Sequence, residues 1–337
     1  MMKYKKELHP LLETLGLIYL TKNFSAAREE LIHSLEEMEI DGETFYKKNL
    51  SWLESYVREF QKKYIPDPED DFFFGNSLEF FLTVSAVLTE YPELETDIDA
   101  LTEETVLEMI ERFFSEDAPQ SPKTLDTMEK RFALIQSTDY PEEAKWKLLT
   151  LLNHPLEMFR SLIGIYRRNR PAFEYSLKKN QDCMGTLLAE APAEASAVMK
   201  NLIRELAPDG ITVYQTAVFP LMEWLNSKTA FQGIMTDKLY LYQKSLSDAR
   251  EILPGMLKLL GDKSKFEILC SLKERGKYNL EIAEELRLTP ATASHHMGLL
   301  LSNQFVAVEK KDGKVYYRLN RETIEEMIRY LEGVFLS

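Results

Sequence analysis

The sequence predicts a mainly α protein, with a multi-helical N-terminal region that includes a small β pair and a C-terminal winged helix-turn-helix of the α+β type. Helical periodicity with short polar breaks runs through the first 206 residues, and β-rich text interrupts it between 207 and 245. Two short helices, a tight turn and a β-hairpin then follow within 278–319. These three observations divide the chain into 1–206, 207–245 and 246–337.

Apolar periodicity predicts a succession of helices in the first region. The expected ranges are 6–21, 25–39, 43–63, 77–90, 100–114, 123–136, 141–152, 155–168, 171–188 and 191–206. The clearest breaks are the acidic, proline-bearing stretches 65–71 and 115–122, which we expect to be surface loops or joints between subdomains.

The middle region is rich in β-branched and aromatic residues. These residues are dense in 210–219 and 233–242, which predicts a pair of strands with a short helix at 221–225 between them. A connecting helix over 246–260 follows. Because Pro254 lies inside its pattern, we expect a kink or a break near Leu253.

The segment 278–302 has the pattern of two short helices joined by a sharp turn at 287–289. The apolar side of the first helix consists of Leu280, Ile282, Ala283 and Leu286. Thr289 followed by Pro290 predicts the start of the second helix, because a hydroxyl at the N-cap and a proline at the first helical position are both favoured. Its expected inward residues are Ala293, Met297, Leu300 and Leu301.

The outward face of that second helix is small, polar and uncharged. It consists of Ala291, Thr292, Ser294, His295 and Gly298. Such a face can approach base edges in the major groove of duplex DNA, where hydroxyl and imidazole groups hydrogen-bond. The residues that we expect to read DNA are Thr289, Ala291, Thr292, Ser294 and His295, whereas we expect His296 to be partly buried.

A β-hairpin follows the second helix. The expected strands are 305–310 and 315–319, with an Asp-Gly turn within 311–314. Period-two alternation turns Val315, Tyr317 and Leu319 inward. The expected outward set, on the side of the recognition helix, is Lys310, Lys311, Lys314, Tyr316 and Arg318. A basic hairpin suits phosphate contacts, which position a protein on DNA without reading sequence.

At these residues the chain resembles the ArsR family of bacterial winged-helix regulators. Residues 289–297 (TPATASHHM) are similar to that family's Ser/Thr-x-x-Thr-x-Ser-x-His-Leu pattern, and residues 312–319 (DGKVYYRL) are similar to its wing. The sequence around 260–269 resembles the helix that opens the family's domain. The resemblance covers only the C-terminal part of the chain and implies a regulator that binds double-stranded DNA.

The chain departs from the family at its usual metal sites. Many metal-sensing members carry Cys-x-Cys on the helix before the recognition helix, where this chain has Tyr278 and Leu280. The last helix, 321–335, contains no histidine for the other common site. We therefore expect no metal sensing at either place and no cofactor. Gly298 also departs from the basic residue common there, and glycine lowers helix propensity by roughly 1 kcal/mol.

The charge of the chain is unevenly distributed. The formal net charge is -14, but 256–337 holds 13 Lys and Arg against 12 Asp and Glu, which leaves -15 for 1–255. The acidic part therefore lies outside the expected DNA-binding domain. This asymmetry allows local positive potential on the wing and predicts modest sequence-independent affinity for DNA.

Other functional classes have weak support in the sequence. No phosphate-binding glycine loop, Gly-x-Ser-x-Gly or His-Glu-x-x-His motif is present, so we expect no catalytic site. Cys183 and Cys270 form no pairing motif, which favours a reducing compartment, and we expect Cys270 to be a core residue. Charged residues interrupt the apolar start of the chain, so we expect no signal peptide, no membrane span and a cytoplasmic protein.

Two features of the acidic region leave sensing open. Phe72, Phe73, Phe74, Phe80 and Phe81 could line an apolar pocket for a small-molecule effector, together with Tyr214, Tyr240 and Tyr242, although core packing is the simpler interpretation. The basic cluster 167–170 is expected to be a solvated helix end, with contact to an anion or DNA backbone as the alternative.

The last expected helix has an apolar stripe. Its members are Ile324, Met327, Ile328, Leu331 and Phe335. The ArsR resemblance implies that this helix contributes to a dimer interface, so we expect a homodimer on inverted-repeat DNA. The leading hypothesis is a sequence-specific transcriptional regulator, a repressor rather than an activator, in which 1–206 senses a signal or controls dimerisation. The alternative is a winged-helix module that binds protein.

Overall fold

The computed structural model describes residues 2–38, 40–75, 77–117, 124–190, 195–206, 210–245, 249–311 and 314–335. The chain forms two compact units. The N-terminal unit consists of Met1–Ile203 and Ala207–Asp237, and the C-terminal unit consists of Arg204–Leu206 and Lys238–Ser337. The predicted mainly α fold with a C-terminal winged helix-turn-helix is confirmed.

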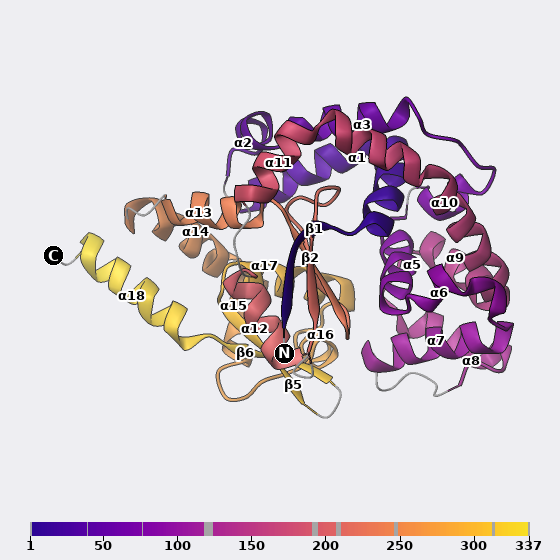
Figure 1. Ribbon diagram of the computed structural model, residues 1–337. Coiled ribbons are helices and arrows are strands. Elements are labelled where there is room, and N and C mark those ends of the chain that lie inside the picture. Colours follow the sequence, from indigo (N-terminus) through magenta and orange to yellow (C-terminus); the bar gives the residue numbers. More distant parts are fainter. Residues whose placement is uncertain are drawn as a thin grey trace. The chain divides into compact units, whose positions relative to one another are not determined.

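The N-terminal unit is a helical assembly with a small sheet (Figure 1). Its helices are α1 (Pro10–Glu37), α2 (Gly42–Asn49), α3 (Trp52–Gln61), α4 (Asp70–Phe74), α5 (Leu78–Glu90), α6 (Glu93–Thr96), the 3-10 helix η1 (Ile98–Ala100), α7 (Glu103–Asp117), α8 (Met128–Ser137), α9 (Glu142–Asn153), α10 (Pro155–Lys179), α11 (Gln181–Glu190) and α12 (Ala197–Leu206). The long helix α10 packs along both α1 and α3.

The helix boundaries of this unit agree only in part with the expected ones. Most of the expected helix 6–21 and the expected helix 25–39 lie in α1, whose two halves meet at a kink at Asn23 (φ -120, ψ 19), where the sequence predicts a break. The Asn23 side-chain amide donates to the carbonyls of Tyr19 (2.9 Å) and Phe74 (2.8 Å), so this irregularity is held by a distant residue. Helix α10 continues through Pro171 and so crosses the boundary that we expected between 155–168 and 171–188. The expected helix 43–63 is divided into α2 and α3.

The phenylalanines of α4 and α5 belong to the hydrophobic core of the N-terminal unit. Phe73, Phe74, Phe80 and Phe81 are fully buried, and the Phe81 ring stacks on Tyr19 with 4.9 Å between ring centroids. The packing interpretation of these four phenylalanines is therefore confirmed.

One carboxyl group is buried in this core. Glu13 on α1 is fully buried and accepts hydrogen bonds from the hydroxyls of Tyr56 (3.0 Å) and Thr216 (2.9 Å) and from the backbone N–H of Ala217 (2.8 Å). Burial raises the pKa of Glu13 to about 7, although these donors favour the charged form. The carboxyl group thereby connects α1, α3 and the end of a strand.

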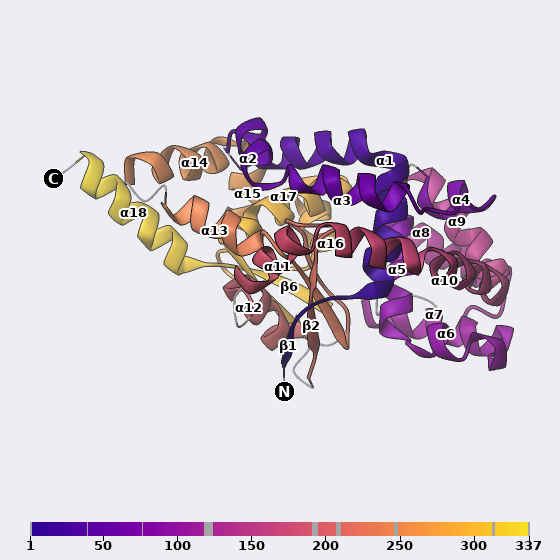
Figure 2. The ribbon, with the colours of Figure 1, turned by 45° about the horizontal axis from the view of Figure 1, so that its top comes forward.

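That strand belongs to a four-stranded sheet with the order β1-β2-β4-β3. Its first two strands, β1 and β2, lie side by side (Figure 2). The strands are β1 (Lys3–Leu8), β2 (Thr212–Thr216), β3 (Glu223–Leu225) and β4 (Thr229–Gly233). β1, β2 and β4 are parallel, and β3 is antiparallel to β4. On one face, Met199 and Ile203 of α12 pack on Val213 and Ala230.

The prediction for this region was partly wrong. β2 lies within the expected strand 210–219, but the expected helix 221–225 contains β3, and most of the expected strand 233–242 is the helix α13 (Thr236–Ser245). The Thr236 hydroxyl donates to the Gly233 carbonyl (2.8 Å), which marks the change from strand to helix. Strand β1 was missed because its pairing with β2 spans the whole unit.

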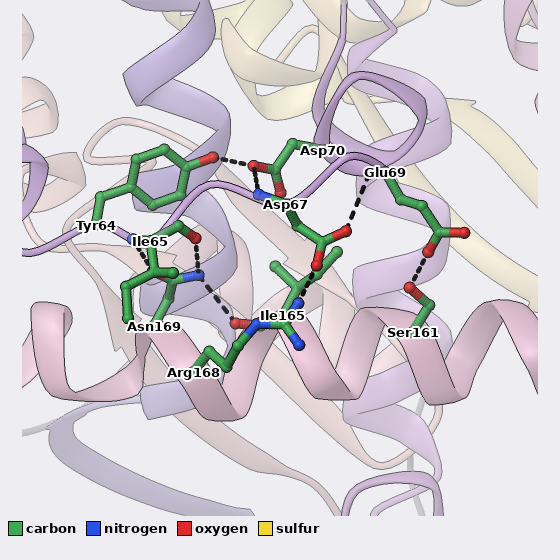
Figure 3. A network of polar contacts seen from close by, with 9 residues as sticks. All are labelled: Tyr64, Ile65, Asp67, Glu69, Asp70, Ser161, Ile165, Arg168 and Asn169. Atoms are coloured by element: carbon green, nitrogen blue, oxygen red, sulfur yellow. Dashed lines mark hydrogen bonds and ion pairs between the residues drawn. The ribbon is translucent and has the colours of Figure 1, made fainter.

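The basic cluster lies in the middle of α10 and not at a helix end as expected, although its arginines are exposed as expected; they also make intramolecular contacts (Figure 3). Arg168 forms an ion pair with Asp67, and Arg167 donates to the Glu95 carbonyl (2.6 Å). The buried Asn169 accepts from the Ile65 backbone N–H (2.8 Å) and donates to the Ile65 carbonyl (3.1 Å). The predicted loop 65–71 is therefore bonded to the middle of a helix.

The C-terminal unit contains most of α13 and all of the elements that remain. They are α14 (Ala249–Gly261), α15 (Lys263–Ser271), α16 (Asn279–Leu286), α17 (Pro290–Ser302), β5 (Val306–Lys311), β6 (Lys314–Leu319) and α18 (Arg321–Phe335). Helix α14 runs through Pro254 without a break, so of the two alternatives expected near Leu253, a kink or a break, the break is wrong. The core contains Leu253, Ile268, Leu269, Leu272, Ile282, Met297, Leu300, Phe305, Val306 and Met327.

Cys270 is exposed on α15 and is not the core residue that we expected. The preceding Ile268 and Leu269 take the buried positions of this short helix. Among the helices of the described ranges, none combines the length and apolar character that crossing a bilayer requires.

Candidate nucleic-acid interface

The helix-turn-helix is formed by α16 and α17 as the sequence predicts. Arg287 adopts the left-handed conformation (φ 55) after α16, and the Leu288 N–H donates to the Ala283 carbonyl (2.9 Å), which closes the helix. The Thr289 hydroxyl then accepts from the Thr292 N–H (3.1 Å), and Pro290 is the first residue of α17. The predicted N-cap is therefore confirmed.

Helix α17 has one buried and one exposed face. Ala293, Met297 and Leu300 are fully buried against the core of the unit. The opposite face exposes Ala291, Ser294, His295 and Gly298, with Thr292 half-buried. A Cβ atom at Gly298 would meet no atom within 4 Å, so this face is open along its length.

The two adjacent histidines have different surroundings. His295 is exposed, whereas His296 is half-buried near the N-terminus of α15, as predicted. Burial lowers the pKa of His296, and the nearby Lys265 lowers it further while Asp262 raises it. The His296 imidazole is therefore neutral at neutral pH.

The wing is the antiparallel pair β5 and β6. Direct pairing places Lys311 opposite Lys314, Glu309 opposite Tyr316 and Ala307 opposite Arg318 on one face. Lys310 pairs with Val315 and lies on the other face. The expectation that Lys310 shares the face of Lys314, Tyr316 and Arg318 is therefore wrong, because adjacent residues of a strand point in opposite directions. The expected Asp-Gly turn at 312–313 lies outside the described residues.

The cations of the wing are held by neighbouring groups. Arg318 forms an ion pair with Glu309 across the hairpin. The Lys314 ammonium lies 4.3 Å from the centroid of the Tyr278 ring. Lys310 and Lys311 are exposed near the tip. A phosphate contact by Arg318 therefore competes with an existing ion pair, whereas the Lys314 ammonium lies over an aromatic ring that does not occupy it with an acidic partner.

Three residues before α16 also contact the wing, and sequence reasoning missed them. The Lys277 and Tyr317 backbones exchange two hydrogen bonds (3.0 Å and 2.8 Å), and the Tyr278 ring meets Tyr316 edge-on, with 5.8 Å between centroids. A Cβ on Gly276 would lie 2.9 Å from Cγ of Arg318. The glycine and the aromatic residue at 276–278 were the available signals, but the pairing partner lies forty residues further on in the chain.

The apolar stripe of α18 is only partly on the surface. Met327 is buried in the core, and Ile324 and Leu331 pack against it. Ile328 is 49% exposed, and Leu257 on the adjoining helix α14 is 40% exposed. The side chain of Phe335 lies outside the described residues. Among the side chains of α14 and α18 that the structure describes, Leu257 and Ile328 are thus the large apolar ones that remain exposed.

Comparison with known proteins agrees with this geometry. The family described as "Bacterial regulatory protein, arsR family" matches residues 262–306, from the start of α15 to the start of β5. The chain is 33% identical over 85 residues to an arsenical resistance operon repressor from Staphylococcus aureus, and 32% identical over 85 residues to one from Staphylococcus xylosus. Each alignment covers 25% of this chain and 82% of the relative.

No solved structure matches the chain. Because each alignment spans a quarter of this chain, the other three-quarters have no counterpart in these two relatives. Family membership points to regulation of transcription rather than catalysis. The chain is a DNA-binding transcriptional regulator and belongs to the ArsR family.

Proposed function

We propose that the chain is a repressor that binds inverted-repeat duplex DNA as a homodimer and takes its signal through the N-terminal unit. The observation that carries this proposal is the open polar face of α17, beside a basic wing, on an otherwise acidic chain. The relatives named as repressors support the direction of regulation.

The contacts divide into reading and positioning groups. Ser294, His295 and Thr292 on α17 are proposed to meet base edges, with Ala291 packing on a thymine methyl group and Thr289 at the helix start. The wing residues Lys310, Lys311, Lys314, Tyr316 and Arg318 are proposed to meet phosphates and sugars. Since Lys310 lies on the other face of the hairpin, it would reach the backbone only from the exposed tip.

The dimer is proposed to form through α14 and α18. Leu257 and Ile328 supply exposed apolar surface on neighbouring helices, and a two-fold axis there would pair each with its own copy or with the other. Ile324, Leu331 and Met327 would support this surface from below. Phe335 belongs to the same proposed stripe.

The signal is proposed to be something other than a metal at the usual family positions. Tyr278 and Leu280 provide no metal ligand where metal-sensing relatives have cysteines, and within the described ranges no group of three or more His, Cys, Asp or Glu is arranged so that it could hold a metal ion. A small-molecule effector bound by the N-terminal unit is the proposed input. Native mass spectrometry of freshly purified protein tests both this input and the dimer.

DNA selection tests the central proposal. Fragments of the source genome retained by the full chain should share an inverted repeat, and the double variant Ser294→Ala/His295→Ala should lose this selection while remaining folded. The matched control is His33→Ala/Ser34→Ala, which removes an adjacent pair of the same two residue types from helix α1. Retention of DNA without regard to sequence would contradict the proposal, and so would equal selection by the first double variant.

A separate pair of variants tests the dimer. Ile328→Glu should convert the chain to a monomer and weaken binding to an inverted repeat. Phe132→Glu, at an exposed apolar residue of α8 in the N-terminal unit, is the control and should remain dimeric. A wild-type chain that is monomeric on DNA would refute the proposed symmetry.

A further inference from the structure

The segment immediately before α16 runs along the wing. Three consecutive residues meet three consecutive residues of β6 in antiparallel order, with Gly276 against Arg318, Lys277 paired with Tyr317, and Tyr278 against Tyr316. The segment therefore extends the two-stranded wing by a short third edge.

Lys277 fixes the backbone part of this connection. Its N–H donates to the Tyr317 carbonyl (3.0 Å), and its carbonyl accepts from the Tyr317 N–H (2.8 Å). Its side chain is buried and forms an ion pair with Glu285 on α16. These contacts join the wing to the helix-turn-helix without involving any expected DNA contact.

Tyr278 makes the side-chain part of the connection. Its backbone N–H donates to the Glu281 carboxylate (3.1 Å), which caps α16, whereas its ring faces the wing. The Tyr316 ring meets the Tyr278 ring at an interplanar angle of 86°, and the Lys314 ammonium lies 4.3 Å from the Tyr278 centroid. Replacement of the ring thus removes the wing contacts and leaves the backbone cap in place.

The Tyr278 ring restricts the motion of the Lys314 side chain and leaves its ammonium group available to a phosphate. An ammonium over an aromatic face is attracted to the ring, yet it retains its charge and its donors for a phosphate. A free lysine loses rotamer freedom when it is immobilised at an interface, and a lysine that is already restricted loses less. An arginine in an ion pair differs, because it must give up a partner.

We propose that Tyr278 is a positioning residue for DNA binding, which holds Lys314 of the wing ready to contact a phosphate, with Tyr316 orienting the ring. The inference rests on the proposed function, since it assigns a role within the DNA interface. It extends that interface to a residue that does not itself touch DNA. At the position where many metal-sensing members of the family carry a cysteine, Tyr278 would therefore support DNA binding.

A double-variant cycle on the full chain tests this inference. The probe is the duplex that the wild-type protein selects. Tyr278→Leu should weaken binding about threefold to tenfold, from the lost cation–π contact and the regained lysine freedom, and Tyr278→Phe should bind like wild type. In a Lys314→Met background the same Tyr278→Leu change should have no effect, whereas in a Lys311→Met background it should keep its full effect.

Salt dependence provides a second readout. Lys314→Met should lower the slope of log K against log salt by about 0.9, because one phosphate contact is lost. Tyr278→Leu should leave this slope unchanged, because Lys314 still contacts the phosphate, although its side chain then loses more conformational entropy on binding. A merely structural role for Tyr278 would weaken binding equally in the Lys314→Met background and would lower the melting temperature.

Each result decides the inference. Wild-type affinity of Tyr278→Leu, or an equal loss with and without Lys314, would overturn it. If Tyr278→Leu does not fold, Tyr278→Met provides a second non-aromatic variant with the same expected cycle. Failure of the wild-type chain to select any duplex would instead refute the proposed function, so the two failures are distinguishable.

Discussion

The two units hold their polar groups by different kinds of contact. In the C-terminal unit, hydroxyls and carboxylates bond close in sequence, as in the N-caps Thr289 with Thr292 and Asp262 with Lys265. In the N-terminal unit, buried polar side chains bond across the chain, as when Glu13 accepts from Thr216 and Asn169 bonds to Ile65. The N-terminal unit also has local caps, such as Asp41 with Thr44, but its buried Glu13 and Asn169 bond to residues more than a hundred positions away.

This difference affects how each unit responds to change. Loss of a local cap weakens one helix end, whereas loss of one member of a distant buried pair leaves its partner unsatisfied in the core. All three tryptophans, Trp52, Trp146 and Trp224, lie in the N-terminal unit. Tryptophan fluorescence therefore follows that unit alone, and DNA binding follows the other.

The largest expected effect is in the core of the C-terminal unit. Met297 is fully buried on α17, and Met297→Ala should reduce the stability of that unit by about 2–5 kcal/mol, because it leaves a cavity. DNA binding should fall sharply, while the urea midpoint followed by tryptophan fluorescence should not change. A shifted midpoint would show that the two units unfold together.

The next effect concerns the buried carboxyl of the N-terminal unit. Since burial raises the pKa of Glu13 to about 7 from a usual 4.5, the folded chain retains a proton that the unfolded chain has released between these values. The free energy of unfolding therefore falls as pH rises through this window. Glu13→Gln should remove this loss, so its stability relative to wild type should increase by about 3 kcal/mol between pH 4.5 and 7.

His9, one turn before Glu13, opposes this trend. Burial lowers the pKa of His9 to about 4 from a usual 6.5, so the unfolded chain binds the extra proton between these values and stability rises with pH. The two contributions offset each other in the wild-type chain. Urea unfolding of Glu13→Gln by tryptophan fluorescence at several pH values should therefore reveal a rising profile, and a pH-independent difference from wild type would contradict the assigned pKa.

A smaller effect is expected at the buried amide of α10. Asn169→Ala should destabilise the N-terminal unit by about 1–3 kcal/mol, because the Ile65 N–H and carbonyl lose their partner. Arg168→Gln, at the preceding residue, is the matched control for the loss of a polar side chain. Its partly exposed ion pair with Asp67 contributes at most about 1 kcal/mol. Similar urea midpoints for the two variants would count against the importance of the amide.

The smallest effect is expected at a local cap. Thr289→Ala should cost about 1 kcal/mol in the C-terminal unit, because the Thr292 N–H loses its acceptor at the start of α17. Thr289→Ser keeps the hydroxyl and should retain wild-type stability. Circular dichroism during thermal unfolding measures the difference, and equal destabilisation by both substitutions would contradict a capping role.

The same contrast explains what the sequence could predict. Thr289, Pro290 and the alternation in 315–319 specify their elements within a few residues, so the helices and strands of the winged helix-turn-helix were anticipated closely. Strand β1 was not anticipated, because its pairing partner β2 lies about two hundred residues away in the chain, and helix α13 was taken for a strand because its residues are rich in leucine and tyrosine. Short apolar runs suit either a strand or a helix until those partners are known.

Within the candidate site, the face of α17 was predictable and the surroundings of the wing were not. The outward positions of Ser294 and His295 follow from helical period alone. The face of Lys310 follows from strand alternation, which places it opposite in direction to Lys311, and this signal was available in the sequence. The contact of Lys314 with Tyr278 depends on a residue before α16 and has no signal within the hairpin.

The most direct test of the account measures the affinity of the full chain for its selected duplex and for a scrambled duplex of the same length and composition, at one salt concentration. Wild type should prefer the selected duplex by at least about 10³-fold, in the range of specific DNA-binding proteins. Ser294→Ala/His295→Ala should lose most of this preference with its scrambled-duplex affinity unchanged, because phosphate contacts by the wing remain. Equal affinity of the wild-type chain for both duplexes would contradict sequence reading by α17.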